Sequence, residues 1–227
     1  LFPYTTLFRS RYPVLDELFN FISNLINSDL RAQISQDYEM GLRYQADNRS
    51  GLRINFFQID TDHEIFLDPE FFTNTNLDGK TRRRGLEFSM FAGIKNLDVS
   101  VGYAYTKADI IGGSYSGKEV PGVPAHQVTL SGLIELGGGV SVAVDGKYVG
   151  SRPFISDFEN AFPFQESYFV MNAKLKYEKN WFSVFVDLNN LTNAVYSEYG
   201  VLGGFPTEQA YYPSPEFNFL VGVAVNF

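Results

Sequence analysis

The stretch 216-EFNFLVGVAVNF-227 decides the fold. Its odd positions are all apolar: Phe217, Phe219, Val221, Val223, Val225 and Phe227. Its intervening even positions are mostly small or polar: Asn218, Leu220, Gly222, Ala224 and Asn226. Since side chains alternate between the two faces of a strand, this pattern predicts one wholly apolar face. A strand of a soluble sandwich has the same pattern. The length, however, suits a tilted crossing of a bilayer, and the terminal aromatic residue is typical of the girdles of membrane barrels.

The composition indicates β architecture and excludes several functions. The 227 residues include 14 Tyr, 22 Phe and 20 Gly, a combination that suits strands joined by tight turns. The net charge of −8 argues against a nucleic-acid partner, which normally requires a basic face. The chain has no Cys, so disulfide and thiolate chemistry are excluded.

Eight further alternating runs precede the terminal stretch. They predict strands at residues 36–46, 51–60, 82–94, 97–106, 126–136, 140–150, 166–177 and 181–190. Their parity predicts that Leu130, Val142 and Val221 face lipid, whereas Ser131 faces the lumen.

The connections between these runs alternate strictly in length. The short ones lie at 47–50, 95–96, 137–139 and 178–180, and the long ones at 61–81, 107–125, 151–165 and 191–215. Greek-key links in a sandwich have no reason to alternate, whereas membrane barrels have short periplasmic turns and long extracellular loops. We therefore predict an all-β, antiparallel up-and-down transmembrane β-barrel, with Phe227 and the turn at 137–139 on the periplasmic side.

The beginning of the chain does not share this pattern. Residues 1–10, LFPYTTLFRS, fit nothing downstream, and we expect them to be a non-native or truncation-edge segment. Residues 11–35 have roughly helical spacing of apolar residues and are expected to form an extracellular loop region that contains at most a short helix. Residues 36–227 are expected to form the barrel portion.

Six segments carry a resemblance to a known family. They are DELF at 16–19, QDYEMGLRY at 36–44, TRRRGLE at 81–87, VPGVPAHQ at 120–127, YVGSR at 148–152 and NLTNAVY at 190–196. In order and spacing, they resemble the C-terminal half of TonB-dependent outer-membrane receptors.

The resemblance implies a 22-stranded barrel in the bacterial outer membrane, plugged by an N-terminal domain that this chain lacks. It also implies import of a ferric siderophore or similar scarce solute, driven through TonB. The nine predicted strands are an odd number, whereas single-chain bacterial barrels have even ones. The odd count therefore indicates part of a larger barrel.

Candidate site residues lie in and beside the long connections. Arg82, Arg83 and Arg84 form a basic run at the outer rim, suited to anionic lipopolysaccharide or to an anionic ferric chelate. Six loop aromatics are candidates for stacking on a ligand: Tyr115, Phe154, Phe158, Phe162, Tyr211 and Tyr212.

Motifs for covalent or cofactor chemistry are weak. The pair His63-Glu64 lacks metal-ligand spacing, and the Gly-rich segment 112–117 lacks the Lys-Ser/Thr of a phosphate-binding loop. We expect no catalytic residue, no resident metal and no cofactor. The expected partners are outer-membrane lipid, lipopolysaccharide, a small ligand such as a ferric chelate, and TonB through the missing N-terminal region.

Two other classes of protein remain open on the sequence. A passive porin-type barrel would lack the plug and the TonB-contacting segment. A soluble β-rich binding module or enzyme would not depend on detergent.

Overall fold

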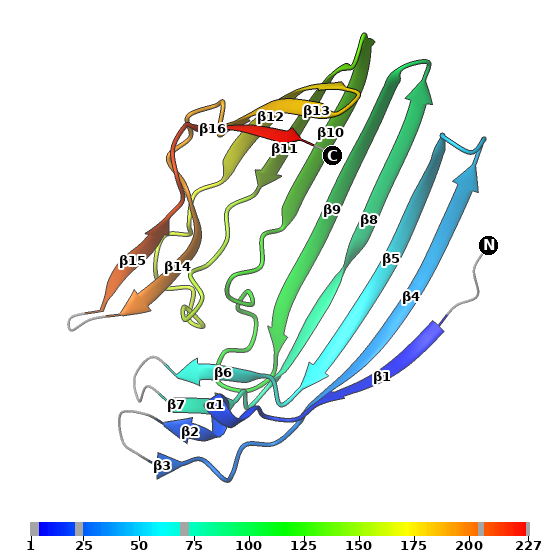
Figure 1. The fold of residues 1–227 in the computed structure, drawn as a ribbon. Helices are drawn as coiled ribbons and strands as arrows, with labels where there is room; N and C mark the ends of the chain where they lie inside the picture. Colours follow the sequence, from blue (N-terminus) through cyan, green and yellow to red (C-terminus); the bar gives the residue numbers. More distant parts are fainter. Residues whose placement is uncertain (1–4, 21–24, 69–72, 204–206, 226–227) are drawn as a thin grey trace.

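The computed structural model describes residues 5–20, 25–68, 73–203 and 207–225. Its main element is one antiparallel sheet (Figure 1). In pairing order, the strands are β1 (Thr5–Arg11), β4 (Gln33–Gln45), β5 (Gly51–Asp62), β8 (Lys80–Ile94), β9 (Leu97–Ile111), β10 (His126–Gly137), β11 (Val140–Val149), β12 (Tyr168–Lys179), β13 (Phe182–Asn189) and β16 (Asn218–Val225). Each strand pairs with its neighbours in sequence order, which confirms the up-and-down topology.

The strand count differs from the prediction. All nine predicted strands are present, but the sheet has ten, because β1 pairs with β4 along its whole length. The argument from an odd count was therefore wrong. The sheet is nevertheless open, since β1 and β16 each pair on one side only within the described residues. That residues 1–10 are non-native stays a prediction, and Phe227 lies outside the described residues.

Strands β8 and β9 extend farther toward the loop end than predicted. The alternation stops at Thr106, where charged residues begin, yet pairing continues to Ile111. Arg82 and Asp109 are register partners in this extension. On the parity of the apolar face, opposite charges replace apolar side chains there, while Ala108 and Ile110 on the other parity pack in a buried apolar cluster, so the backbone ladder continues beyond the apolar band.

One face of the sheet is apolar from strand to strand. Leu130 lies opposite Val101 on β9 and Gly146 on β11. Val142, which shares this face, is in line with Val221 through successive register partners on β12 and β13. These side chains are uncovered, with Leu130 43% and Val221 55% exposed. We call this surface the apolar face; its continuity is the property needed to contact lipid.

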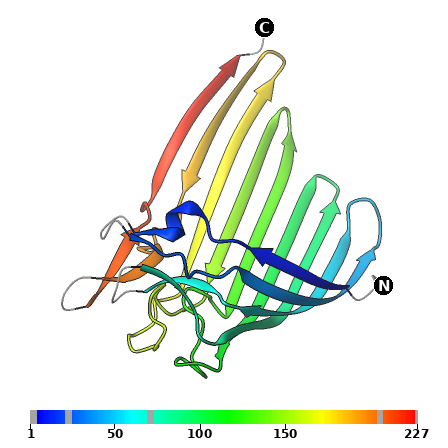
Figure 2. The same ribbon diagram turned by 90° about the horizontal axis from the view of Figure 1, so that it is seen from below.

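The opposite surface, here called the lumen face, is covered by loops at one end. Seen from that end, the loop elements gather at the near ends of the strands (Figure 2). Thr81 and Ile110 are register partners there and are almost fully buried. Val149 and Tyr168 are likewise partners and are buried. All four belong to the parity opposite Leu130 and Val142, so the loops fold over the lumen face and leave the apolar face free.

The long connections contain small elements of their own. These are α1 (Leu15–Leu18), β2 (Phe19–Asn20) with β3 (Leu25–Ile26), β6 (Ile65–Asp68) with β7 (Thr73–Asn76), and β14 (Ser197–Gly203) with β15 (Glu208–Pro213). The predicted short helix in residues 11–35 is thus a single turn, and β4 begins within that region, at Gln33. Within the described residues, no helix has both the length and the apolar character needed to span a membrane.

The structure explains one residue in each of two motif segments, Gly85 in TRRRGLE and Asn190 in NLTNAVY. At Gly85, a Cβ atom would lie 1.8 Å from the backbone oxygen of Tyr105, so only glycine fits. Asn190 has a left-handed backbone (φ 51°) and is buried. Its side-chain amide donates to the carbonyls of Ala194 and Pro215, and its side-chain oxygen accepts from the Ala194 amide. Asn190 therefore holds the start of the last long loop onto the start of the closing strand.

Candidate functional site

An apolar cluster joins three loops at the loop end. Leu77, Ile110 and Val120 are buried in it together with Ala108. Two predicted ligand-contacting residues, Tyr115 and Phe158, pack against this cluster. The Phe158 ring centroid lies 4.3 Å from that of Phe66 and 5.5 Å from that of Tyr115. These aromatic side chains therefore fix the loops to one another, and their contact with a ligand stays a prediction.

Polar contacts hold the same loops together. The Glu119 amide donates to the Asn160 side-chain oxygen at 2.7 Å, and Asn160 Nδ2 donates to the Glu119 carbonyl at 3.2 Å. The Asp78 carboxylate accepts from the Ser114 hydroxyl at 2.7 Å and from its backbone amide at 2.9 Å. The hydroxyl contact is the main cause that lowers the pKa of Asp78. These contacts connect the loops at the loop end into one layer.

The three arginines of the basic run do not form one cluster. Arg82 and Arg84 lie on the apolar-face side, whereas Arg83 lies on the lumen face, as alternation requires. Each has an acidic partner: Arg82 contacts Asp60 at 2.7 Å, Arg83 contacts Glu64 at 2.7 Å, and Arg84 is 3.9 Å from Asp109. A single ligand cannot contact all three, and only Arg83 is on the lumen side.

The Arg83–Glu64 pair stabilises the loop that follows β5. Arg83 donates to both Glu64 oxygens, at 2.7 and 2.9 Å, and the Thr81 hydroxyl also donates to this carboxylate. Burial opposes ionisation of Glu64, but the contacts from Arg83 and Thr81 outweigh it and lower the pKa of the Glu64 carboxyl below its usual value. The ionised form is thus favoured in the folded state.

We expect this pair to make the β6–β7 hairpin sensitive to acid. Because the folded pKa is lowered, the stabilisation is fully present above the unfolded pKa of about 4.3 and is lost as pH falls through the folded pKa. Glu64→Gln should weaken local protection by about 1–2 kcal/mol at pH 7. Amide hydrogen exchange of residues 63–80 in the full-length receptor measures this. The difference between wild type and variant should shrink below pH 4.5, and a difference independent of pH would contradict the assignment.

A pocket of about 440 Å³ lies between the start of β12 and the β14–β15 hairpin. Its lining includes Gln165, Tyr168, Tyr196 and the predicted ligand-contacting residue Tyr211. The rings of Tyr168 and Tyr196 are 4.4 Å apart. Tyr168 is on the lumen face, so we call this the mouth pocket. Its wall combines these aromatic rings with polar side chains such as Gln165 and Gln209, and a concave site that has both is suited to a small molecule.

The other three predicted aromatics differ in position. Phe154 is fully buried and supports the pocket from behind, since its ring meets that of Tyr211 edge-on at 5.3 Å. Phe162 is half-buried, and its backbone amide donates to the buried Asp157 carboxylate. Tyr212 is 63% exposed and is the register partner of Tyr199 on the hairpin. Of the six predicted aromatics, Tyr211 alone is among the residues that line the mouth pocket.

Two buried polar side chains beside the mouth pocket were missed by the sequence analysis. Arg152 and Gln165 are 4% and 3% exposed and face each other across an antiparallel bridge. Arg152 Nη2 donates to the carbonyls of Ser197 and Glu198, and its guanidinium lies over the Tyr168 ring. Arg152 Nη1 and both polar atoms of the Gln165 amide have no hydrogen-bond partner. Arg152 is the last residue of the YVGSR segment at 148–152, and that family-like segment was the sequence feature that could have indicated it.

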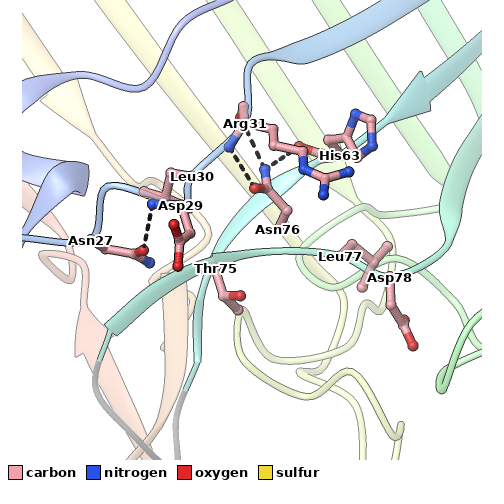
Figure 3. A pocket seen from close by; sticks show the side chains of 9 residues that line it. All are labelled: Asn27, Asp29, Leu30, Arg31, His63, Thr75, Asn76, Leu77 and Asp78. Atoms are coloured by element: carbon pink, nitrogen blue, oxygen red, sulfur yellow. Dashed lines mark hydrogen bonds between the residues drawn. The ribbon is translucent and has the colours of Figure 1, made fainter.

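A second pocket, of about 490 Å³, lies between the segment before β4 and strand β7 (Figure 3). Asn76 organises it: its side-chain oxygen accepts from the Arg31 amide, and its Nδ2 donates to the carbonyls of Arg31 and His63. His63 lines this pocket, whereas Glu64 is held by Arg83. The side chains of His63 and Glu64 therefore belong to different contacts and do not form one site. The described residues contain no group of three His, Cys, Asp or Glu side chains arranged to hold a metal ion.

Comparison with known proteins decides the family. The family model for TonB dependent receptor-like β-barrels matches residues 4–191. The chain belongs to the TonB-dependent receptor family. Barrels of this family lie in the bacterial outer membrane, and the predicted family, fold class and location are confirmed; that the apolar face contacts lipid stays a prediction.

Individual TonB-dependent receptors resemble this chain in sequence or in fold. An uncharacterized TonB-dependent receptor of Haemophilus influenzae is 25% identical over 191 residues, which are 76% of this chain and 54% of that protein. The ferric-catecholate import receptor Fiu of Escherichia coli K12 is 28% identical with a TM-score of 0.70, covering 88% of this chain and 29% of its own. The siderophore receptor PiuA of Acinetobacter baumannii has a TM-score of 0.78 at 18% identity, covering 98% and 33%. The chain thus spans about half of the curated relative and about a third of the solved receptors.

Proposed function

We propose that the whole protein is an active-transport receptor that imports a ferric siderophore or similar scarce chelate by coupling to TonB through its N-terminal region. Family membership supports the class of function, and the similarity to a ferric-catecholate import receptor supports the class of solute. In this proposal the receptor binds and moves its solute without covalent chemistry, and the loop end faces the medium.

The observation that carries the proposal is the chemistry of the mouth pocket. Tyr211 lines this pocket and is 53% exposed, which leaves ring surface for stacking on a ligand. Gln165, which lines the pocket, and Arg152, which is not among the lining residues, retain unused hydrogen-bonding atoms that are costly when buried without a partner. A planar, oxygen-bearing ligand would satisfy both features of the pocket wall, because its ring can stack on Tyr211 and its oxygens can accept from the Gln165 amide.

Tyr211→Ala in the full-length receptor tests the pocket. Loss of one aromatic contact is worth about 0.5–1.5 kcal/mol, so we expect affinity for a ferric catecholate to fall by about two- to tenfold. The measurement is binding of the radiolabelled ferric chelate to iron-limited whole cells, with receptor abundance determined by surface labelling.

Tyr199→Ala is the matched control. Tyr199 is on the same hairpin and 59% exposed, but it is not among the residues that line the mouth pocket. Its variant should bind normally. Equal losses of affinity in the two variants would show that the ligand is not recognised in the mouth pocket. Uptake that persists in cells lacking TonB would instead favour a passive, porin-type barrel.

A further inference from the structure

Two hydrogen-bond acceptors of the mouth pocket have no role in the function proposed above. Gln165 is 3% exposed, and neither atom of its side-chain amide has a partner within the described residues. The amide nitrogen can donate to an oxygen of the solute, but the amide oxygen then still lacks a donor, which is costly for a buried acceptor. Since both atoms are unpartnered, one acceptor is present whichever way the amide is turned. The second acceptor is the carboxylate of Glu166, which also lines the pocket.

The charge of Glu166 has no counter-charge in the pocket wall. Its side chain is exposed, and it takes part in none of the ion pairs among the described residues. The described residues that line the mouth pocket include no Lys, Arg or His. Arg152 is 4% exposed and donates to backbone carbonyls, and Lys147 lies 3.6 Å from the Glu198 carboxylate. The lining of the pocket thus carries one carboxylate and no cation.

Aromatic rings form much of the remaining wall of the mouth pocket. They belong to Phe164, Tyr168, Tyr196 and Tyr211. The faces of such rings carry negative partial charge and attract cations. One ring already does so, since the Arg152 guanidinium lies 5.7 Å from the centroid of Tyr168. Phe164 and Tyr196 are only half-buried, so ring surface remains for a second cation. Aromatic rings, a carboxylate and an unpartnered amide oxygen together suit a cationic hydrogen-bond donor.

We propose that the mouth pocket binds a protonated amine, which the transported solute carries beside its oxygen-bearing ring. The ammonium group donates to the Glu166 carboxylate and to Gln165 Oε1, and its charge contacts the ring faces of Phe164 and Tyr196. The ring of the same solute stacks on Tyr211. A primary amine is favoured over a quaternary one, because only the primary amine has N–H groups to donate. The assignment of the amine to the solute rests on the proposed function, whereas the preference of the pocket for an ammonium group does not.

The first test compares two probes, n-propylammonium and n-propanol, on the full-length receptor in mild detergent. Both probes donate hydrogen bonds and have the same length, but only the amine is charged at pH 7. Binding is measured by ligand-observed NMR, with micelles that lack receptor as the blank. We expect wild type to bind n-propylammonium about fivefold more tightly than n-propanol.

Two charge-matched variants locate this preference in the pocket. Glu166→Gln should abolish most of it, because the charge-assisted hydrogen bond is lost. Glu159→Gln is the matched control: Glu159 lies in the same loop and is exposed, but it does not line the mouth pocket. Its variant changes the net charge equally and should keep the preference.

A second test addresses the solute itself. The probes are a ferric catecholate whose ligand has a free lysyl amine and the same complex with a hydroxyl group in place of the amine. On iron-limited whole cells, wild type should bind the amine-bearing complex about fivefold more tightly, and Glu166→Gln should bind both equally.

Equal affinity of wild type for n-propylammonium and n-propanol would overturn the proposal. So would an equal loss of the preference in Glu166→Gln and Glu159→Gln, because the charge would then act from a distance and not by contact in the pocket. A preference for n-propylammonium together with normal chelate binding by Tyr211→Ala would retain the ammonium site and reject the mouth pocket as the chelate site. The failure of this proposal and that of the proposed function are therefore distinguishable.

Discussion

An arginine at position 130 should destabilise the full-length receptor strongly, whereas one at position 131 should not. Leu130 lies on the apolar face within the bilayer, where burying a guanidinium in lipid costs about 2–4 kcal/mol. Ser131 lies on the lumen face, and its register partner on β11 is Asp145. An arginine there faces an opposite charge across the strands, so we expect a cost below about 1 kcal/mol.

Urea unfolding of Leu130→Arg and Ser131→Arg in liposomes measures this difference. The two positions are adjacent in one strand, so strand propensity and distance from the turn are matched. Val142→Arg and Val221→Arg should also be destabilising, by less where the residue lies closer to an interface. Equal costs at 130 and 131 would refute the assignment of the two faces.

Expression of the 227-residue chain by itself should yield no closed barrel. In lipid, every backbone polar group needs a partner, and each unsatisfied one costs several kcal/mol. Within the described residues, β16 pairs only with β13, and β1 only with β4. Two free edges with exposed apolar side chains favour pairing between chains, so we expect aggregates.

Gel electrophoresis with and without boiling, after refolding into detergent, tests this expectation. The full-length receptor is the positive control and should shift in mobility on heating, as a folded barrel does. The isolated chain should show no heat-modifiable monomer. A soluble, monodisperse product that unfolds cooperatively would instead favour a soluble β-rich module.

The sequence by itself determined nine of the ten strands of the described sheet and their up-and-down order. Alternation is a local property, because the strand period of two can be read from the side chains of one segment. The terminal strand, observed as Asn218–Val225, and the short turn at 95–96 were therefore interpreted correctly without tertiary information, whereas the turn predicted at 178–180 lies at 180–181. The same locality explains the error at Thr106, since pairing beyond it depends on residues 80–84 of β8, which are distant in sequence, and on the apolar cluster that buries Ala108 and Ile110.

Only the tertiary structure decided the composition of the candidate site. Arg82, Arg83 and Arg84 are consecutive, yet they lie on alternating faces and have separate partners. Phe154 and Tyr211 seemed equivalent as loop aromatics, but one is buried and the other lines the mouth pocket. Arg152 and Gln165 gained significance only when the chain brought them beside the β14–β15 hairpin. These relations join residues up to about fifty positions apart, and the packing of whole loops, rather than any local periodicity, sets them.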